Sequence, residues 1–342
     1  MRFDYSRELA GGALLTVFPV ESTLLQNNPL GDPHVRSQPV LLPPGVQAGE
    51  ASGLPLVTVL VGYTGFNHKV LNKSSMWGEN VPEMFARGMA SGEIPPAVFL
   101  WPACETRLGG SQYVDSSGTG PYMSYLLDEV VPATEARYGC GGDGKRVVVG
   151  KSSGGYGALT LAMRRPGYFQ AVGSHAGDMG FDMSHFRGFA DALNCWAKYG
   201  GPEAFVAELP KLEKFGHMEH AGIEGIAMAA CYSPNPDAPL GVDLPLVPET
   251  GEIREDIFAR WLKHDPLRMV EQESCAQSLR GLRALFLDAG ERDEFALQWG
   301  LKRMAKRLEE LEIPAEVQYF PGGHFAMDHR YLVSLPRLLG SL

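Results

Sequence analysis

The stretch 147–157 contains the residues best suited to chemistry in this chain. Gly150, Ser152 and Gly154 match the pattern G-x-S-x-G, in which a tight turn between a strand and a helix exposes a serine hydroxyl. Glycine is needed on both sides because a Cβ there would strike the neighbouring strand or helix. The valines at 147–149 predict a buried strand, and the segment 158–163 predicts a helix. We therefore expect Ser152 to be a nucleophile.

A serine hydroxyl needs a base within hydrogen-bond reach and an acid that orients this base. With this type of turn the expected order along the chain is serine, acid, histidine. Among the downstream histidines, only His324 follows the last predicted strand on a glycine-containing loop, so it is the candidate base. The acid should follow the preceding strand, where spacing alone does not choose among Asp288, Glu291, Asp293 and Glu294.

Acyl transfer to serine also requires an oxyanion hole, which is usually formed by two backbone N–H groups. One is expected from Ser153, directly after the nucleophile. The other is expected from the loop after the predicted strand 56–61, with the N–H of Tyr63 as the best candidate. Phe66 in the same loop and His175 at the end of the predicted strand 170–174 are candidate substrate contacts.

The predicted elements place these residues at one edge of a sheet. We expect strands at 13–20, 38–42, 56–61, 97–101, 147–149, 170–174, 284–287 and 317–320, and helices at 84–91, 118–138 with a kink at Pro132, 158–163 and 294–311. After an antiparallel edge formed by the first two strands, strands and helices alternate, which predicts a mostly parallel sheet flanked by helices. The carboxyl ends of its strands form the active edge.

The segment 183–282 interrupts this alternation. It contains helical stretches near 186–196 and 257–262 and a proline-rich loop. We interpret it as a lid-like insertion packed over the cleft, so that residues 1–342 form a single α/β domain.

Composition excludes several function classes. The 342 residues carry a formal net charge of −10, which disfavours a nucleic-acid partner. No apolar run reaches the ~18 residues of a transmembrane helix, so no membrane partner is expected. Five scattered cysteines and a charged N-terminal segment favour the cytoplasm, and a homo-oligomer is compatible with the sequence.

Two other kinds of site are conceivable from the sequence. Gly150, Lys151 and Ser152 could end a phosphate-binding loop, but Lys145 occupies the position of its first glycine. His175, Asp178, Asp182 and His185 could bind zinc, but a polar rim of the cleft is the favoured interpretation.

Together these motifs resemble the esterase D-type branch of the α/β-hydrolases, which includes S-formylglutathione hydrolases, feruloyl and enterochelin-type esterases, and mycolyltransferases. The resemblance rests on the segments 41–45 (LLPPG), 61–62 (VG), 118–122 (GTGPY), 150–155 (GKSSGG), 288–295 (DAGERDEF) and 322–324 (GGH). It implies an α/β-hydrolase fold, and it implies that Asp293 is the acid, at the end of D-x-G-x-x-D. Val61 stands where such proteins usually have histidine.

The expected function is therefore a serine hydrolase that cleaves a small-molecule carboxylic ester through an acyl-enzyme, with the triad Ser152, Asp293 and His324. This mechanism requires neither a metal nor an organic cofactor. Two alternatives remain, an acyltransferase that uses the same triad and a hydrolase fold that has lost activity and serves as a binding module.

Overall fold

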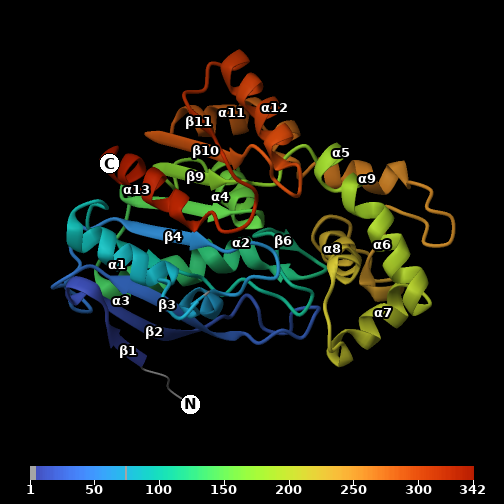
Figure 1. Ribbon diagram of the computed structural model, residues 1–342, viewed down its shortest axis with the longest axis horizontal. Coiled ribbons are helices and arrows are strands. Elements are labelled where there is room, and N and C mark those ends of the chain that lie inside the picture. Colours follow the sequence, from blue (N-terminus) through green and yellow to red (C-terminus); the bar gives the residue numbers. More distant parts are fainter. Residues whose placement is uncertain (1–4, 74) are drawn as a thin grey trace.

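The computed structural model describes residues 5–73 and 75–342. Within them, a nine-stranded sheet in the order β1-β2-β3-β5-β4-β8-β9-β10-β11 forms the centre of the molecule (Figure 1). Its strands are β1 (Tyr5–Glu8), β2 (Leu14–Glu21), β3 (Val35–Leu42), β4 (Leu56–Leu60), β5 (Val98–Leu100), β8 (Arg146–Lys151), β9 (Ala171–His175), β10 (Ala284–Gly290) and β11 (Glu316–Phe320). Within this sheet the pairs β1–β2, β2–β3 and β3–β5 are antiparallel, and all other pairs are parallel. The predicted α/β class with an antiparallel edge is confirmed.

Helices cover both faces of the central part of this sheet, where every residue of β4, β5 and β9 is buried. Val147 and Val149 of β8 pack in the core under α1 and α13, whereas Val148 packs in the core on the other face. The helices of the first face are α1 (Val81–Ser91) and α13 (Tyr331–Gly340). Those of the second face are α3 (Val131–Tyr138), α4 (Ser153–Arg164), α11 (Glu273–Arg280) and α12 (Leu297–Glu310).

A further group of helices lies beside the sheet and has its own core. It consists of α5 (Phe181–Ser184), α6 (Phe186–Tyr199), α7 (Pro202–Glu208), α8 (His217–Tyr232) and α9 (Glu255–Leu262). Figure 1 shows α6, α7 and α8 together on one side of the molecule. The short helix α10 (Pro266–Met269) and α11 instead pack into the core of the main sheet. We infer that the inserted unit ends near Asp265, earlier than the expected residue 282.

Several expected elements differ from the structure. The predicted helix 118–138 starts only at Tyr122, because β6 (Asp115–Ser116) and β7 (Gly120–Pro121) form a small antiparallel sheet before it. A π-helical stretch, Tyr125–Val130, separates α2 (Tyr122–Ser124) from α3, and Pro132, where a kink was expected, lies in the first turn of α3. The elements β1, α7, α8 and α13 were not predicted. Among the described residues, no helix is long and apolar enough to span a membrane.

Candidate active site

Ser152 occupies the turn between β8 and α4 in a strained backbone conformation. Its φ and ψ are 60° and −128°, values that a residue with a side chain adopts only when the surrounding structure imposes them. A Cβ on Gly150 would collide with the backbone of Gly154, and a Cβ on Gly154 would collide with the carbonyl of Leu60. The N–H of Ser152 donates to the carbonyl oxygen of His175 at 2.9 Å. The predicted strand–turn–helix arrangement around Ser152 is therefore present.

His324 and Asp293 form a buried pair on two adjoining loops. His324 Nδ1 lies 2.8 Å from Asp293 Oδ2, and the two side chains are 5% and 0% exposed. The other carboxylate oxygen, Oδ1, accepts from the N–H of Phe295 at 2.9 Å, which fixes the orientation of the carboxylate. The loops are joined by two backbone hydrogen bonds of 2.9 Å, from Glu291 to Phe320 and from Arg292 to Gly322. The hydrogen bonds between the loops that follow β10 and β11 thus determine where Asp293 and His324 lie.

The other three carboxylates of the acid loop have different surroundings. Asp288 lies within β10, where Oδ1 is 2.7 Å from His175 Nδ1 and Oδ2 accepts from Arg330 Nε at 2.7 Å. Glu294 accepts from the backbone N–H of His324 at 2.5 Å, and Glu291 is exposed. Of the four candidates, only Asp293 contacts the imidazole of His324 among the described residues.

His175 does not reach the site. It is 1% exposed, its Nδ1 contacts Asp288, and its Nε2 lies 2.9 Å from Ser334 Oγ on α13. Both ring nitrogens are therefore occupied on the face of the sheet that α13 covers. The expected substrate contact of His175 is not supported by this placement.

A pocket of about 650 Å³ brings most of the other candidates together. Its lining includes Ser152, Ser153, His324, Tyr63 and Phe66. The backbone N–H groups of Ser153 and Tyr63 have no hydrogen-bond acceptor within the described part of the chain. Phe66 is 44% exposed, which places it at the pocket mouth and not in the core. Two free N–H donors beside the serine can serve as an oxyanion hole.

Four further polar residues line this pocket. Asp178, which follows β9, was expected from the sequence as part of a polar rim of the cleft, whereas His217, His220 and Glu224 on α8 were not identified as site residues. Asp178 Oδ2 accepts from Ser153 Oγ at 3.3 Å, and burial, assisted by Asp293, raises its pKa to about 6. Burial, assisted by Asp178, raises the pKa of Glu224 to about 8. No sequence signal marked His220 or Glu224, because α8 itself was not recognised.

The candidate zinc ligands have separate partners. His175 is held between Asp288 and Ser334, and Asp182 pairs with Arg303 at 2.7 Å. Within residues 5–73 and 75–342, no group of three or more histidine, cysteine, aspartate or glutamate side chains is arranged to hold a metal ion.

Comparisons with solved structures show the fold. A ferulic acid esterase is 17% identical with a TM-score of 0.63, and the match covers 96% of this chain and 98% of that chain. S-formylglutathione hydrolase from Agrobacterium tumefaciens is 15% identical with a TM-score of 0.59, and both chains are covered completely. Fluorophosphonate-binding serine hydrolase F of Staphylococcus aureus is 12% identical with a TM-score of 0.59, covering 96% and 98% of the two chains. At these identities the likeness extends to the fold alone.

The family comparison covers most of the chain. No curated protein matches the sequence significantly. A family model with the description "Putative esterase" matches residues 39–331, a range that includes the serine turn and both loops of the His324–Asp293 pair. The chain therefore belongs to this esterase family, with an α/β fold and ester hydrolysis as its class of reaction.

Proposed function

We propose that the protein is a serine hydrolase that cleaves a small-molecule carboxylic ester through an acyl-enzyme. Ser152 attacks the ester carbonyl while His324 takes the hydroxyl proton. His324 then gives this proton to the leaving alcohol, and Asp293 orients the imidazole and stabilises its charged form. Water attacks the acyl group in the second half of the reaction, with His324 again acting as the base.

The observation that carries this proposal is the buried 2.8 Å contact between His324 Nδ1 and Asp293 Oδ2 at the pocket that contains Ser152. A carboxylate at Nδ1 holds the neutral imidazole in the tautomer whose Nε2 is free to accept a proton. A binding module would have no need for this arrangement at a pocket whose half-buried serine lies on a strained turn.

The N–H groups of Ser153 and Tyr63 are the proposed donors to the oxyanion. Gly62 supports this role, because a Cβ built on it would lie 3.1 Å from Ser152 Cβ, so that the backbone of this loop runs directly beside the nucleophile. Loss of one such donor costs roughly 3 kcal/mol of transition-state stabilisation in comparable sites. Glycine at position 62 therefore permits the close approach of this loop to Ser152, although Val61 replaces the histidine that usually precedes this glycine.

Turnover of p-nitrophenyl butyrate tests the proposal. The wild type should release a burst of nitrophenol equal to the enzyme concentration when deacylation is slower than acylation, whereas Ser152→Ala should show neither burst nor turnover. Ser274→Ala on the surface of α11 is the matched control and should behave like the wild type. If wild type and Ser152→Ala are equally inert towards a broad panel of esters, the protein is a binding module and the proposal fails.

Acyl transfer is the remaining alternative, because an alcohol can replace water in the second half-reaction without any change in the triad. Product analysis in the presence of a competing alcohol separates the two. Formation of free acid as the main product supports hydrolysis, and formation of the new ester as the main product shows a transferase.

A further inference from the structure

The pocket of Ser152 has a polar wall that the proposed reaction does not use. His220 and Glu224 lie one turn apart on α8 and face the pocket, with His220 Nδ1 3.6 Å from Glu224 Oε2. Asp178 lines the same pocket from the main sheet. None of these side chains is required for attack, proton transfer or oxyanion stabilisation. A wall of this kind is suited to recognising part of the substrate.

The pocket continues from this wall towards α6. A smaller cavity of about 50 Å³ is lined by Asp178, His220, Glu224 and Phe295, all of which also line the larger pocket, and by His185 at the start of α6. His220 and Glu224 thus lie where the space beside Ser152 passes into the insertion. A substrate group extending from the serine in this direction would contact them first.

His185 is the independent sign that this space receives a ligand. The residue is 6% exposed, and its Nε2 is buried without a hydrogen-bond partner among the described residues. Its Nδ1 lies 4.0 Å from Glu224 Oε1, beyond hydrogen-bond distance. A buried polar atom without a partner destabilises the free protein, and a ligand that supplies the partner recovers this cost on binding.

The charge states of the wall favour an uncharged ligand. Burial lowers the pKa of His185 to about 4 and also lowers the pKa of His220, so both rings are neutral at pH 7. Glu224, with a pKa of about 8, is mostly protonated at this pH. These groups offer hydrogen-bond donors and acceptors side by side, which is the complement of a hydroxyl group. An anionic ligand would be repelled by the Asp178 carboxylate, and on α8 itself Glu224 carries little charge that could attract a cation.

The wall lies on the side of His324. The ring of Phe295 packs against His324 at 4.7 Å between ring centroids and against His220 at 6.2 Å. Because His324 protonates the leaving oxygen, the alcohol part of an ester departs on this side of the site. The group that contacts α8 therefore belongs to the alcohol.

We propose that the α8 end of the pocket binds an uncharged, hydroxyl-bearing alcohol part of the ester substrate, and that Glu224, His220 and His185 are its specificity-determining residues. This inference rests on the proposed serine esterase function and names the substrate class of the same site. The preferred substrates are esters of polyols, not esters of simple alkanols, amino alcohols or hydroxy acids.

Four butyrate esters that differ only in the alcohol test this inference: those of glycerol, n-propanol, choline and 3-hydroxypropanoate. Each kcat/KM is divided by the rate constant of alkaline hydrolysis of the same ester, which removes differences in leaving-group reactivity. The glycerol ester should be preferred over the propyl ester by roughly tenfold, since a site built for hydroxyl groups discriminates against analogues that lack them. A ratio near one, or a preference for the choline or anionic ester, would overturn the inference.

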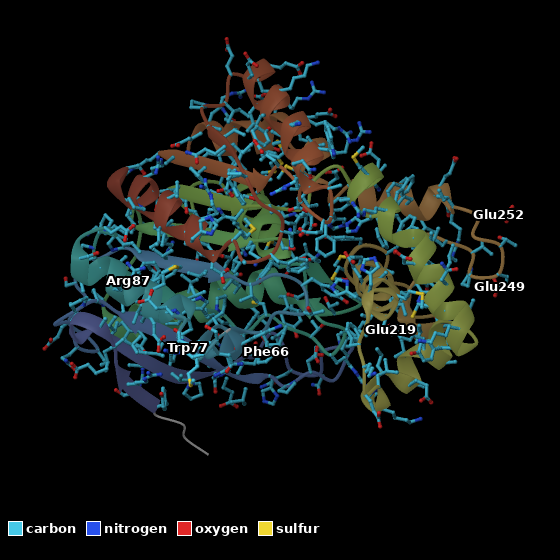
Figure 2. All side chains as sticks on the ribbon, viewed as in Figure 1. Phe66, Trp77, Arg87, Glu219, Glu249 and Glu252 are labelled. Carbon is cyan, nitrogen blue, oxygen red and sulfur yellow. The ribbon has the colours of Figure 1, made fainter. Side chains whose placement is uncertain are left out.

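Variants identify the residues responsible through the same ratio. Glu224→Leu should bring the glycerol-to-propyl ratio close to one, whereas Glu224→Gln, which keeps hydrogen-bonding capacity without charge, should retain most of it. Glu249→Leu is the matched control, because Glu249 is exposed on the outer side of the insertion, away from the pocket (Figure 2), and the ratio should not change. If Glu224→Gln loses the ratio as fully as Glu224→Leu, a charged carboxylate is required and the neutral subsite is refuted.

The remaining outcomes are also distinguishable. His220→Phe replaces Glu224→Leu if the latter does not fold, and it should lower the same ratio. If Ser152→Ala hydrolyses propyl butyrate as fast as the wild type, the proposed function fails. If hydrolysis depends on Ser152 but the wild type does not discriminate among the four alcohols, only the inference about α8 fails.

Discussion

Asp293 and Asp288 allow a sharp test of the catalytic assignment, because both are buried and both contact a histidine. Asp293→Asn preserves the volume of the side chain and lets its amide oxygen continue to accept from the N–H of Phe295. The new NH₂ group then points at His324 Nδ1. This forces the proton onto Nε2, and the imidazole can no longer accept the proton of Ser152.

The expected loss is large and confined to catalysis. In a serine protease with the same constellation, the corresponding change lowers kcat by about 10⁴-fold, or about 5.5 kcal/mol at 1.4 kcal/mol per factor of ten. We expect a loss of this order for Asp293→Asn. Stability should change much less, because the substitution is isosteric and the backbone hydrogen bond of Asp293 is kept.

Asp288→Asn should have the opposite profile. This change breaks the buried ion pair with Arg330, which is 9% exposed, and weakens the contact with His175. Removal of one partner from a buried pair typically costs 3–5 kcal/mol of stability, because the other charge remains buried. Activity per folded molecule should stay within a few-fold of the wild type, since neither partner lines the pocket.

The two effects are measured separately by kcat/KM for p-nitrophenyl butyrate, normalised to folded protein, and by urea unfolding. The assignment is refuted if Asp288→Asn loses about 10³-fold in kcat per folded molecule while Asp293→Asn retains more than a tenth of the wild-type value. That result would transfer the role of the acid to Asp288.

Three further predictions follow from single contacts. Tyr63→Phe removes the 2.8 Å hydrogen bond to the carbonyl of Leu108 and should lower the free energy of unfolding by about 1 kcal/mol, while kcat stays within threefold of the wild type. A loss of about 10²-fold in kcat would show that the hydroxyl of Tyr63, not its backbone N–H, serves the reaction. Gly154→Ala forces a Cβ into the backbone of β4 and should lower Tm strongly and abolish turnover. Gly188→Ala in α6, which has open space around it, should instead raise the free energy of unfolding by about 0.5–1 kcal/mol. Equal Tm values for the two variants would contradict the packing argument. Glu224 holds its proton up to about pH 8 in the folded protein but only up to about pH 4.5 in the unfolded chain, so its contribution to stability declines as the pH rises through this window. The Tm of Glu224→Gln relative to that of the wild type should therefore increase from pH 5 to pH 8. A difference in Tm that does not change with pH would show that the pKa of Glu224 is not raised.

The turn at Ser152 was predictable because every local signal agrees there. Three β-branched residues, a run of small residues and a helix-forming segment specify strand, turn and helix without reference to distant parts of the chain. The strain at Ser152, with its φ of 60°, is what the flanking glycines made foreseeable. The expected position of the histidine, downstream of the serine and after the last strand, followed from the type of turn.

His175 shows where such reasoning fails. The end of its strand was located correctly, but alternate residues of a strand point to opposite faces of the sheet. Ser174 points towards α4, where its hydroxyl donates to the carbonyl of Gly155, so His175 must point towards α13. Because α13 was not predicted, nothing in the sequence indicated that this face was covered or that Ser334 would meet the imidazole.

The residues of α8 escaped prediction for a different reason. Nearly every position of this helix is buried, so its sequence lacks the alternation of polar and apolar faces that marks a surface helix. The acid was ambiguous in a related way. Asp288 and Asp293 look alike in sequence, and only the pairing of Asp288 with its neighbours in β9 and β11 shows that it lies inside the sheet and not beyond its edge.

The packing that buries α8 also connects it to the turn that holds Ser152. Tyr156 lies one turn after Ser152 on α4, and its ring packs against Tyr232 of α8 at 6.2 Å and against Phe181 of α5 at 5.9 Å. The helix that begins after Ser152 therefore also positions the insertion. The proposed catalytic groups all belong to loops of the main sheet, whereas the polar wall belongs largely to α8. Changes at His220 and Glu224 of α8 should accordingly alter which ester is cleaved, and changes at Tyr156 should alter selectivity and rate together.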